Sequence, residues 1–183
     1  MSHIVFENVD IVFGEAQKNA LVKLDQGGTR DEILKSTGSV IGVTGASLTV
    51  EEGEICVLMG LSGSGKSTLL RAVNGLNKVA RGKVMLKHRG AMVDIAKTDA
   101  DTLRAVRTES VAMVFQQFAL LPWRTVKDNV GFGLELKGMS KDERDAIVDQ
   151  KLKMVQLDPW AQKYAHELSG GMQQRVGLAR AFA

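Results

Sequence analysis

One nine-residue loop constrains this chain more than any other feature of its sequence. Residues 60–68 read Gly-Leu-Ser-Gly-Ser-Gly-Lys-Ser-Thr, which matches the phosphate-binding pattern G-x-x-x-x-G-K-[ST]. A short apolar run at 54–59 precedes the loop, and Leu69, Leu70 and Val73 follow it at helical spacing. Such a run is typical of a strand buried on both faces of a parallel sheet. The order of strand, loop and helix therefore predicts an α/β fold with a parallel core sheet.

The residue types in this loop fit one chemistry. Glycines let backbone N–H groups point inward at the start of a helix, where an anion is favoured. Lys66 adds a mobile charge for the β- and γ-phosphates, Ser67 can place its hydroxyl on Mg²⁺, and Thr68 can reach the α-phosphate. The loop by itself leaves kinases, GTPases and ATPases open. The expected nucleotide-binding residues are Gly60, Leu61, Ser62, Gly63, Ser64, Gly65, Lys66, Ser67 and Thr68.

Two later segments carry further signals. Residues 111–116 form a second apolar run that ends in Gln116, whose amide can both donate and accept. Taken by itself, this run is better explained as an ordinary polar strand end. Ser169 followed by Gly170 and Gly171 opens an apolar-periodic helix, which predicts a serine N-cap and a second backbone anion site. A capped helix with a flexible lead-in is the simpler alternative.

The remaining pattern predicts elements around these segments. Residues 4–13 favour a strand, and a polar, irregular stretch follows it. Thr29 and Glu32 have the spacing of a capping box, so a short helix is expected there, ending at Gly38. Residues 42–54 alternate as a half-buried strand does.

A longer helix is predicted in the second half of the chain. Ser140 opens a second capping box, and the helix should run to about Gln156. Its inward face is expected to include Ile147, Met154 and Val155.

The sequence LSGGMQQR at 168–175, downstream of GLSGSGKST and with VFQ at 114–116 between them, resembles the ATP-binding subunits of ABC transporters. The resemblance implies a head-to-tail dimer of two ATPase subunits. The signature residues of one copy would then face the γ-phosphate held by residues 60–68 of the other. These signature residues are Ser169, Gly170, Gly171 and Gln173.

The same resemblance implies roles for single residues. Gln116 matches the glutamine that contacts Mg²⁺ and senses the membrane subunit. Gln116 and Lys66 are therefore the expected catalytic residues, and Ser67 and Gln116 the expected Mg²⁺ ligands. Phe13 resembles the aromatic residue that stacks on adenine.

The resemblance also divides the chain, with all of 1–183 read as a partial ABC nucleotide-binding domain with N-terminal antiparallel strands. Residues 1–119 would form the core with both nucleotide loops, 120–175 a helical subdomain with the signature motif, and 176–183 the signature helix. The run FALLPWRTV lies where such domains receive the membrane subunit. Trp123 in this run is either an exposed docking residue or part of the subdomain core.

Closer similarity narrows the expected substrate. The loop, the run FALLPWRTV and the insertion containing DEILKSTG resemble importers of quaternary amines such as choline, glycine betaine and proline betaine. This implies transmembrane permease subunits as partners, indirectly a substrate-binding protein, and a peripheral position on the cytoplasmic face of the inner (plasma) membrane. The net charge of +3 is too small to indicate a nucleic-acid partner. The one cysteine, Cys56, lies in an apolar run and is expected to be buried.

The family pattern continues beyond the last residue of this sequence. The Walker B strand, its Mg²⁺-coordinating Asp, the catalytic Glu and the switch His have no counterpart here, so we expect a fragment that binds nucleotide weakly and hydrolyses little ATP. Apolar strand edges should be exposed as a result. Two other interpretations are a soluble ABC ATPase without a membrane partner and an inactive nucleotide-binding fragment.

Overall fold

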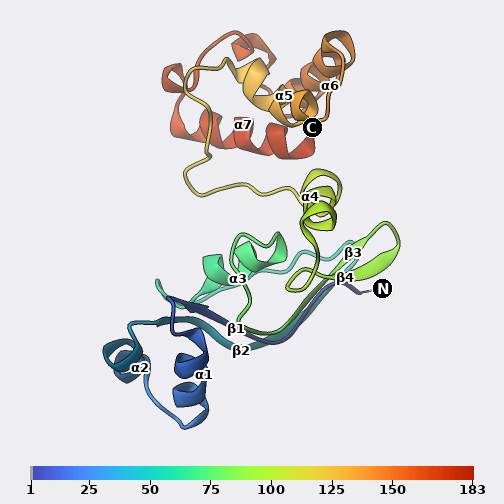
Figure 1. Ribbon diagram of the computed structural model, residues 1–183. Helices are drawn as coiled ribbons and strands as arrows, with labels where there is room; N and C mark the ends of the chain where they lie inside the picture. The colour runs from blue at the N-terminus through green and yellow to red at the C-terminus, as the bar shows by residue number, and fades with distance from the viewer. Residues whose placement is uncertain (1) are drawn as a thin grey trace. The chain divides into compact units, whose positions relative to one another are not determined.

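The chain divides after Val111 into two compact units (Figure 1). The computed structural model describes residues 2–183. Each unit has a hydrophobic core of its own, so the fold of each follows from its own residues.

The first unit is built on a four-stranded antiparallel sheet of order β2-β1-β3-β4. Its strands are β1 (Ser2–Phe13), β2 (Val40–Glu51), β3 (Arg81–His88) and β4 (Ala91–Asp94). The expected strands at 4–13 and 42–54 are thus confirmed as β1 and β2. Fully buried side chains on the sheet include Val9, Ile11, Val84 and Leu86.

Four helices complete the first unit: α1 (Gln17–Asp25), α2 (Arg30–Thr37), α3 (Lys66–Val73) and α4 (Ala100–Glu109). Helix α3 lies over one face of the sheet, and the pair α1 and α2 lies at one end of it (Figure 1). Because α3 packs Leu69, Ala72 and Val73 into the sheet core, the loop before it is held at the sheet.

Of the two inserted helices, α2 was predicted from local sequence signals and α1 was not. The capping box is present: the Glu32 amide donates to Thr29 Oγ1 at 3.3 Å and the Thr29 amide donates to Glu32 Oε2 at 2.9 Å. Gly38 ends α2 at a φ of 67°, a value that glycine adopts without strain. Helix α1, in contrast, replaces the expected irregular stretch. Its N-cap residue, Ala16, offers no side-chain hydrogen bond, and its one buried residue is Ala20, so its sequence signal is weak.

An arginine paired with one buried and one exposed carboxylate ties the insertion to the sheet. Asp10 on β1 is 2% exposed, receives the Gly45 amide at 2.7 Å and pairs with Arg81. The same guanidinium donates to both carboxylate oxygens of Asp25, at the end of α1, at 2.8 Å. Hydrogen bonding to Arg81 lowers the pKa of Asp25.

The expected parallel core strands are not formed, and this part of the prediction is wrong for the described residues. Residues 54–59 and 111–116 are irregular and pair with no strand. A parallel strand needs neighbouring strands for its backbone hydrogen bonds, and the described residues supply none here.

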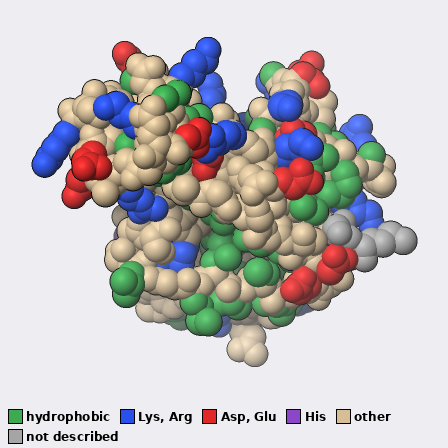
Figure 2. Space-filling view, turned by 90° about the horizontal axis from the view of Figure 1, so that it is seen from below, with side chains coloured by type: hydrophobic (Ala, Val, Ile, Leu, Met, Phe, Trp, Pro, Cys, Tyr) green, Lys and Arg blue, Asp and Glu red, His purple; other side chains and the backbone are tan. Residues whose placement is uncertain are grey.

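The apolar edges of this region are exposed, as expected. Ile55 is 90% and Met59 86% exposed. Cys56 is exposed as well, which corrects the prediction that it is buried. Hydrophobic side chains also gather with few charged neighbours on the face shown in Figure 2.

The second unit is helical. Helices α5 (Val126–Leu136), α6 (Lys141–Met154) and α7 (Gly170–Phe182) pack together, with short 3₁₀ helices at Asp158–Trp160 and Ala165–Glu167. Their shared core includes Val126, Val130, Val148, Leu152, Leu157 and Val176.

Helix α6 begins where the sequence predicts it, but its buried face is rotated from the expected one. The Ser140 hydroxyl caps its first turn. Val148 and Leu152 are the buried residues, whereas Met154 is 56% exposed. Ile147 and Val155 pack at the margin of the core. The helix is rich in charged residues on several sides, so the sequence defines its apolar face poorly.

The boundary between the units falls earlier than the sequence suggests. Residues 112–119 belong to the second unit, whereas the sequence placed them in the 1–119 core. Contacts from α7 explain the difference: a Cβ added at Gly177 would lie 3.6 Å from Val114, and Arg180 donates to the carbonyl oxygens of Phe118 and Ala119.

Candidate functional site

Glycines shape the loop before α3 through close backbone contact. Gly63 has a φ of 79° and Gly65 a φ of 93°, both in the region that disfavours side chains. A Cβ at Gly65 would lie 2.5 Å from the carbonyl oxygen of Gly42 on β2. Any other residue at 65 would push the loop away from the sheet.

Lys66 lies inside the loop that it terminates. Its Nζ donates to the carbonyl oxygens of Gly60 at 2.9 Å and Leu61 at 2.7 Å, and to Ser64 Oγ at 3.3 Å. The positive charge of the ammonium thus lies within the loop, beside the positive end of α3. Gly65 supplies no side-chain cap to that helix start, so its first N–H groups are left for an anion.

The other loop residues are accessible to a ligand. Ser62 and Ser67 are exposed, and Thr68 is half-buried. Ser67 follows Lys66 in the first turn of α3, where its hydroxyl suits a metal ion that accompanies phosphate. The structure therefore fits a polyphosphate group at residues 60–68.

Phe13 lies next to the same loop. A Cβ added at Gly42 would lie 2.7 Å from Phe13 Cε2 and 3.1 Å from Thr68 Cγ2. The Phe13 ring and the Thr68 methyl group therefore both lie close to Gly42. Phe13 remains 41% exposed, which leaves part of its surface for a stacked ring.

In the second unit, the signature segment starts α7. Ser169 is its N-cap and accepts the Met172 amide at 3.4 Å, which confirms the predicted cap. Gly170 and Gly171 are exposed, and an added Cβ at either would meet no described atom within 4 Å. The first turn of α7 therefore begins with two exposed residues that have no side chains, next to the Ser169 cap.

Gln173 braces the segment that leads into the signature. Its Nε2 donates to the carbonyl oxygens of Ala165 at 2.9 Å and Leu168 at 3.2 Å. The side chain is half-buried. In this structure, its amide nitrogen therefore holds the entry to α7 in place.

Gln116 begins a turn in the second unit. It is exposed, and so is its neighbour Gln117. Phe118 and Ala119, which follow, have φ values of 57° and 48°, uncommon for residues with side chains. Arg180, which the sequence analysis did not single out, donates to both of their carbonyl oxygens at 2.7 Å.

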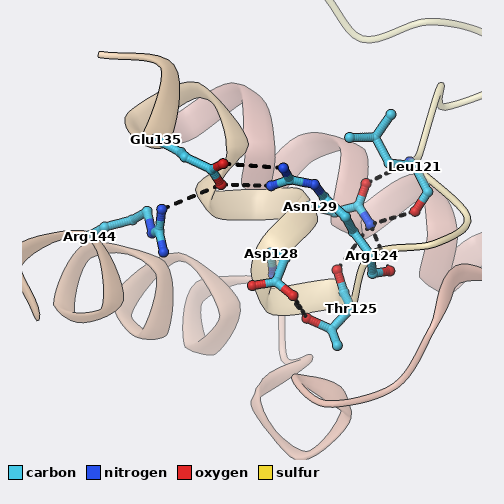
Figure 3. Close-up of polar contacts among 7 residues, drawn as sticks. All are labelled: Leu121, Arg124, Thr125, Asp128, Asn129, Glu135 and Arg144. Carbon is cyan, nitrogen blue, oxygen red and sulfur yellow. Dashed lines mark hydrogen bonds and ion pairs between the residues drawn. The ribbon is translucent and has the colours of Figure 1, made fainter. Parts of the chain in front are cut away.

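Residues 121–125 form a loop, called here the Trp123 loop, that Asn129 organises from within α5 (Figure 3). Asn129 is 1% exposed. Its Oδ1 accepts the Leu121 amide at 2.7 Å, and its Nδ2 donates to the carbonyl oxygens of Leu121 at 3.1 Å, Arg124 at 3.2 Å and Thr125 at 2.9 Å. One buried amide therefore takes part in four of the hydrogen bonds that order this loop.

Charged side chains hold the outside of the Trp123 loop (Figure 3). Arg124 binds Glu135 through two hydrogen bonds of 2.6 and 3.2 Å and lies 5.0 Å from the ring centre of Phe132. Arg144 reaches Glu135 at 3.4 Å. The hydrogen bonds from Arg124 lower the pKa of Glu135, and that carboxylate raises the pKa of Arg124.

Trp123 itself stands out from this fixed loop. It is 71% exposed, so its assignment to the subdomain core is excluded. An exposed aromatic residue on a preordered loop has the properties of an interface anchor.

Two features are not found among the described residues. Within residues 2–183, no three His, Cys, Asp or Glu side chains are grouped so that they could hold a metal ion. In the same range, no helix has the length and apolar character to cross a membrane.

The loop, the lysine inside it and the helix start behind it match the phosphate-binding loop of the P-loop class of proteins. The chain belongs to the ABC transporter family, whose family model matches residues 43–183.

Named relatives agree with this assignment. ATP-binding protein ProV of the glycine betaine/proline betaine transport system of Escherichia coli (strain K12) is 49% identical over 177 residues, 97% of this chain and 43% of the relative. Glycine betaine/carnitine transport ATP-binding protein GbuA of Listeria monocytogenes serotype 1/2a (strain 10403S) is 47% identical over 183 residues, 100% of this chain and 45% of the relative. The chain thus spans less than half the length of these curated relatives.

Solved structures confirm the expected ABC ATPase fold. The dimeric bacterial ABC transporter cassette MJ0796 has a TM-score of 0.79 and 32% identity, covering 98% of this chain and 69% of that one. The same cassette in a post-hydrolysis state bound to ADP and Pi has a TM-score of 0.77 and 31% identity, with the same coverage.

Proposed function

We propose that residues 60–68 bind the phosphates of ATP and that Phe13 stacks on its adenine. The position of the Lys66 ammonium carries this proposal: it lies among loop carbonyl oxygens, which phosphate oxygens would replace as stronger, charged acceptors. Ser67 and Gln116 are the proposed contacts of Mg²⁺, which neutralises charge on the phosphoryl group when bound.

The signature residues act on a second subunit in this proposal. Ser169, Gly170 and Gly171 would meet the γ-phosphate held by the partner copy, and Gln173 would fix their approach. Two exposed glycines at the start of α7, where helix N–H groups favour an anion, support this role. The dimeric state named for the related cassette MJ0796 agrees with a shared site.

The whole protein is then the energy-coupling subunit of an ABC importer of quaternary amines, powered by ATP binding and hydrolysis. The substrate class follows from the names of the relatives, which include glycine betaine, proline betaine and carnitine transport proteins. Choline is a further substrate candidate of the same chemistry.

The proposed membrane contact is the Trp123 loop. Its conformation is fixed by Asn129, and its tryptophan is 71% exposed, so a helix of a permease subunit could dock without reordering the loop. The subunit would then lie on the cytoplasmic face of the inner membrane, with a substrate-binding protein as an indirect partner.

Two variants of the full-length protein test the division of roles. Lys66→Ala should lose ATP affinity and, with it, ATP-dependent dimerisation, measured by fluorescent ATP titration and by crosslinking. Ser169→Ala should retain ATP affinity and lose dimerisation. Equal loss of ATP binding in both variants would reject these roles.

A third variant tests the membrane partner. Trp123→Ala should keep ATP affinity and lose copurification with permease subunits and uptake of radiolabelled glycine betaine. If the unmodified protein instead copurified with nucleic acid in a salt-sensitive manner, a soluble ABC ATPase would be the better description.

A further inference from the structure

Arg180 joins α7 to the turn that follows Gln116. Its two terminal nitrogens donate at 2.7 Å to the carbonyl oxygens of Phe118 and Ala119. These acceptors belong to consecutive residues with left-handed backbone, at φ values of 57° and 48°. Such conformations are strained for residues with side chains and persist where the surrounding structure enforces them.

The environment of Arg180 shows that this contact is specific. The side chain is half-buried, and desolvation lowers its pKa. Within the described part of the chain, no carboxylate pairs with it. Its charge is therefore compensated by backbone carbonyl groups, and a planar fork suits two adjacent acceptors better than an ammonium does.

A second contact lies one turn earlier on the same helix face. Gly177 is buried, and a Cβ there would lie 3.6 Å from Val114 Cγ1 and 3.9 Å from Phe118 Cβ. Gly177 and Arg180 thus hold the chain on both sides of Gln116 against α7. The start of α7 is the signature segment at Ser169.

We propose that Arg180 is a positioning residue that fixes the Gln116 turn to the signature helix. The two elements then move as one body. When the signature segment approaches the partner's nucleotide, the same movement positions the Gln116 amide. This inference rests on the proposed role of Gln116 in ATP hydrolysis.

The first test measures position directly and requires no nucleotide. A spin label is attached at Gln117→Cys in the full-length protein, with its native cysteines, Cys56 included, replaced by Ser. Arg180→Lys should increase the mobility of the label because an ammonium cannot hold both carbonyl groups. Arg175→Lys is the matched control, since Arg175 on the same helix donates at 2.9 Å to the distant carbonyl of Val155, and it should leave the label unchanged. Equal mobility in both variants would overturn the inference.

The second test uses a double-mutant cycle on ATP turnover in the assembled transporter. Arg180→Lys should lower kcat by about tenfold and leave KM for ATP within about twofold, as expected when a reacting group is misplaced. In a Gln116→Ala background the same change should have no further effect.

The outcomes separate the two proposals. Losses that multiply in the double variant would overturn the role of Arg180 while leaving that of Gln116 intact. An unchanged kcat in Gln116→Ala would overturn the proposed role of Gln116 and the inference with it.

Discussion

The ring of Phe13 covers Gly42 so closely that a methyl group at position 42 would lie 2.7 Å from Cε2 of the ring. Gly42 also approaches the phosphate loop, because its carbonyl oxygen would lie 2.5 Å from a Cβ at Gly65. Phe13 and the phosphate loop therefore both lie against Gly42 of β2. This relationship places a stacking surface beside a polyphosphate site.

Replacing Phe13 should separate base recognition from phosphate recognition. Phe13→Ala should weaken ATP binding by about tenfold, since an aromatic residue that stacks on a base contributes about 1 to 3 kcal/mol. Competition by inorganic tripolyphosphate, which has no base, should be unchanged. Phe13→Tyr preserves the ring and should retain affinity. An equal loss of ATP and tripolyphosphate affinity would show that Phe13 supports the loop and contacts no base.

Removing the Asn129 amide should loosen the Trp123 loop. Asn129→Ala removes the acceptor of the Leu121 amide and the side-chain donor to three carbonyl groups. The carbonyl groups of Leu121 and Thr125 keep a backbone donor each, so the second unit should lose about 3 kcal/mol of unfolding free energy, mainly through the unpaired Leu121 amide and Arg124 carbonyl. Hydrogen exchange of the Leu121 amide should accelerate.

Gln150→Ala serves as the control for this variant. Gln150 is exposed on α6, and its replacement should change the unfolding free energy by less than about 0.5 kcal/mol. If Leu121 exchanged at the same rate in both variants, the loop would be ordered by something other than Asn129.

The pH dependence of the second unit should carry a contribution from Glu135. Its pKa is lowered by Arg124, so the folded state binds a proton there less readily than the unfolded state. The stabilisation is present above the ordinary glutamate pKa and is lost as pH falls through the lowered value. Glu135→Gln should therefore lower the melting temperature at pH 7 and have a smaller effect near pH 3. A constant difference between the two proteins over this range would contradict the assignment.

Local patterns predicted local structure well. The phosphate loop depends on glycines within a few residues of one another, and the capping box at Thr29 and the glycine stop at Gly38 are equally local. Ser169 and Ser140 cap α7 and α6 as their spacing predicts. For the three caps, the partner of the hydroxyl is a backbone N–H three residues further along the chain.

Structure that depends on distant partners was less predictable. The apolar runs at 54–59 and 111–116 read as strands, yet a strand requires a neighbour that the run itself does not encode. Asn129 and Arg180 were missed because their partners are backbone carbonyl groups, which any residue carries. No sequence pattern distinguishes such an acceptor, so these contacts became visible in the structure.

Equilibrium titration of the full-length protein with fluorescent ATP tests the central claim most directly. We expect saturable binding that Lys66→Ala weakens by about 10- to 100-fold, since a charged hydrogen bond to phosphate contributes about 1.5 to 3 kcal/mol. Lys35→Ala, at an exposed lysine on α2, should bind ATP as the unmodified protein does. Binding that is equal in Lys66→Ala and the unmodified protein, or no saturable binding in either, would contradict the assignment of residues 60–68 as the nucleotide site.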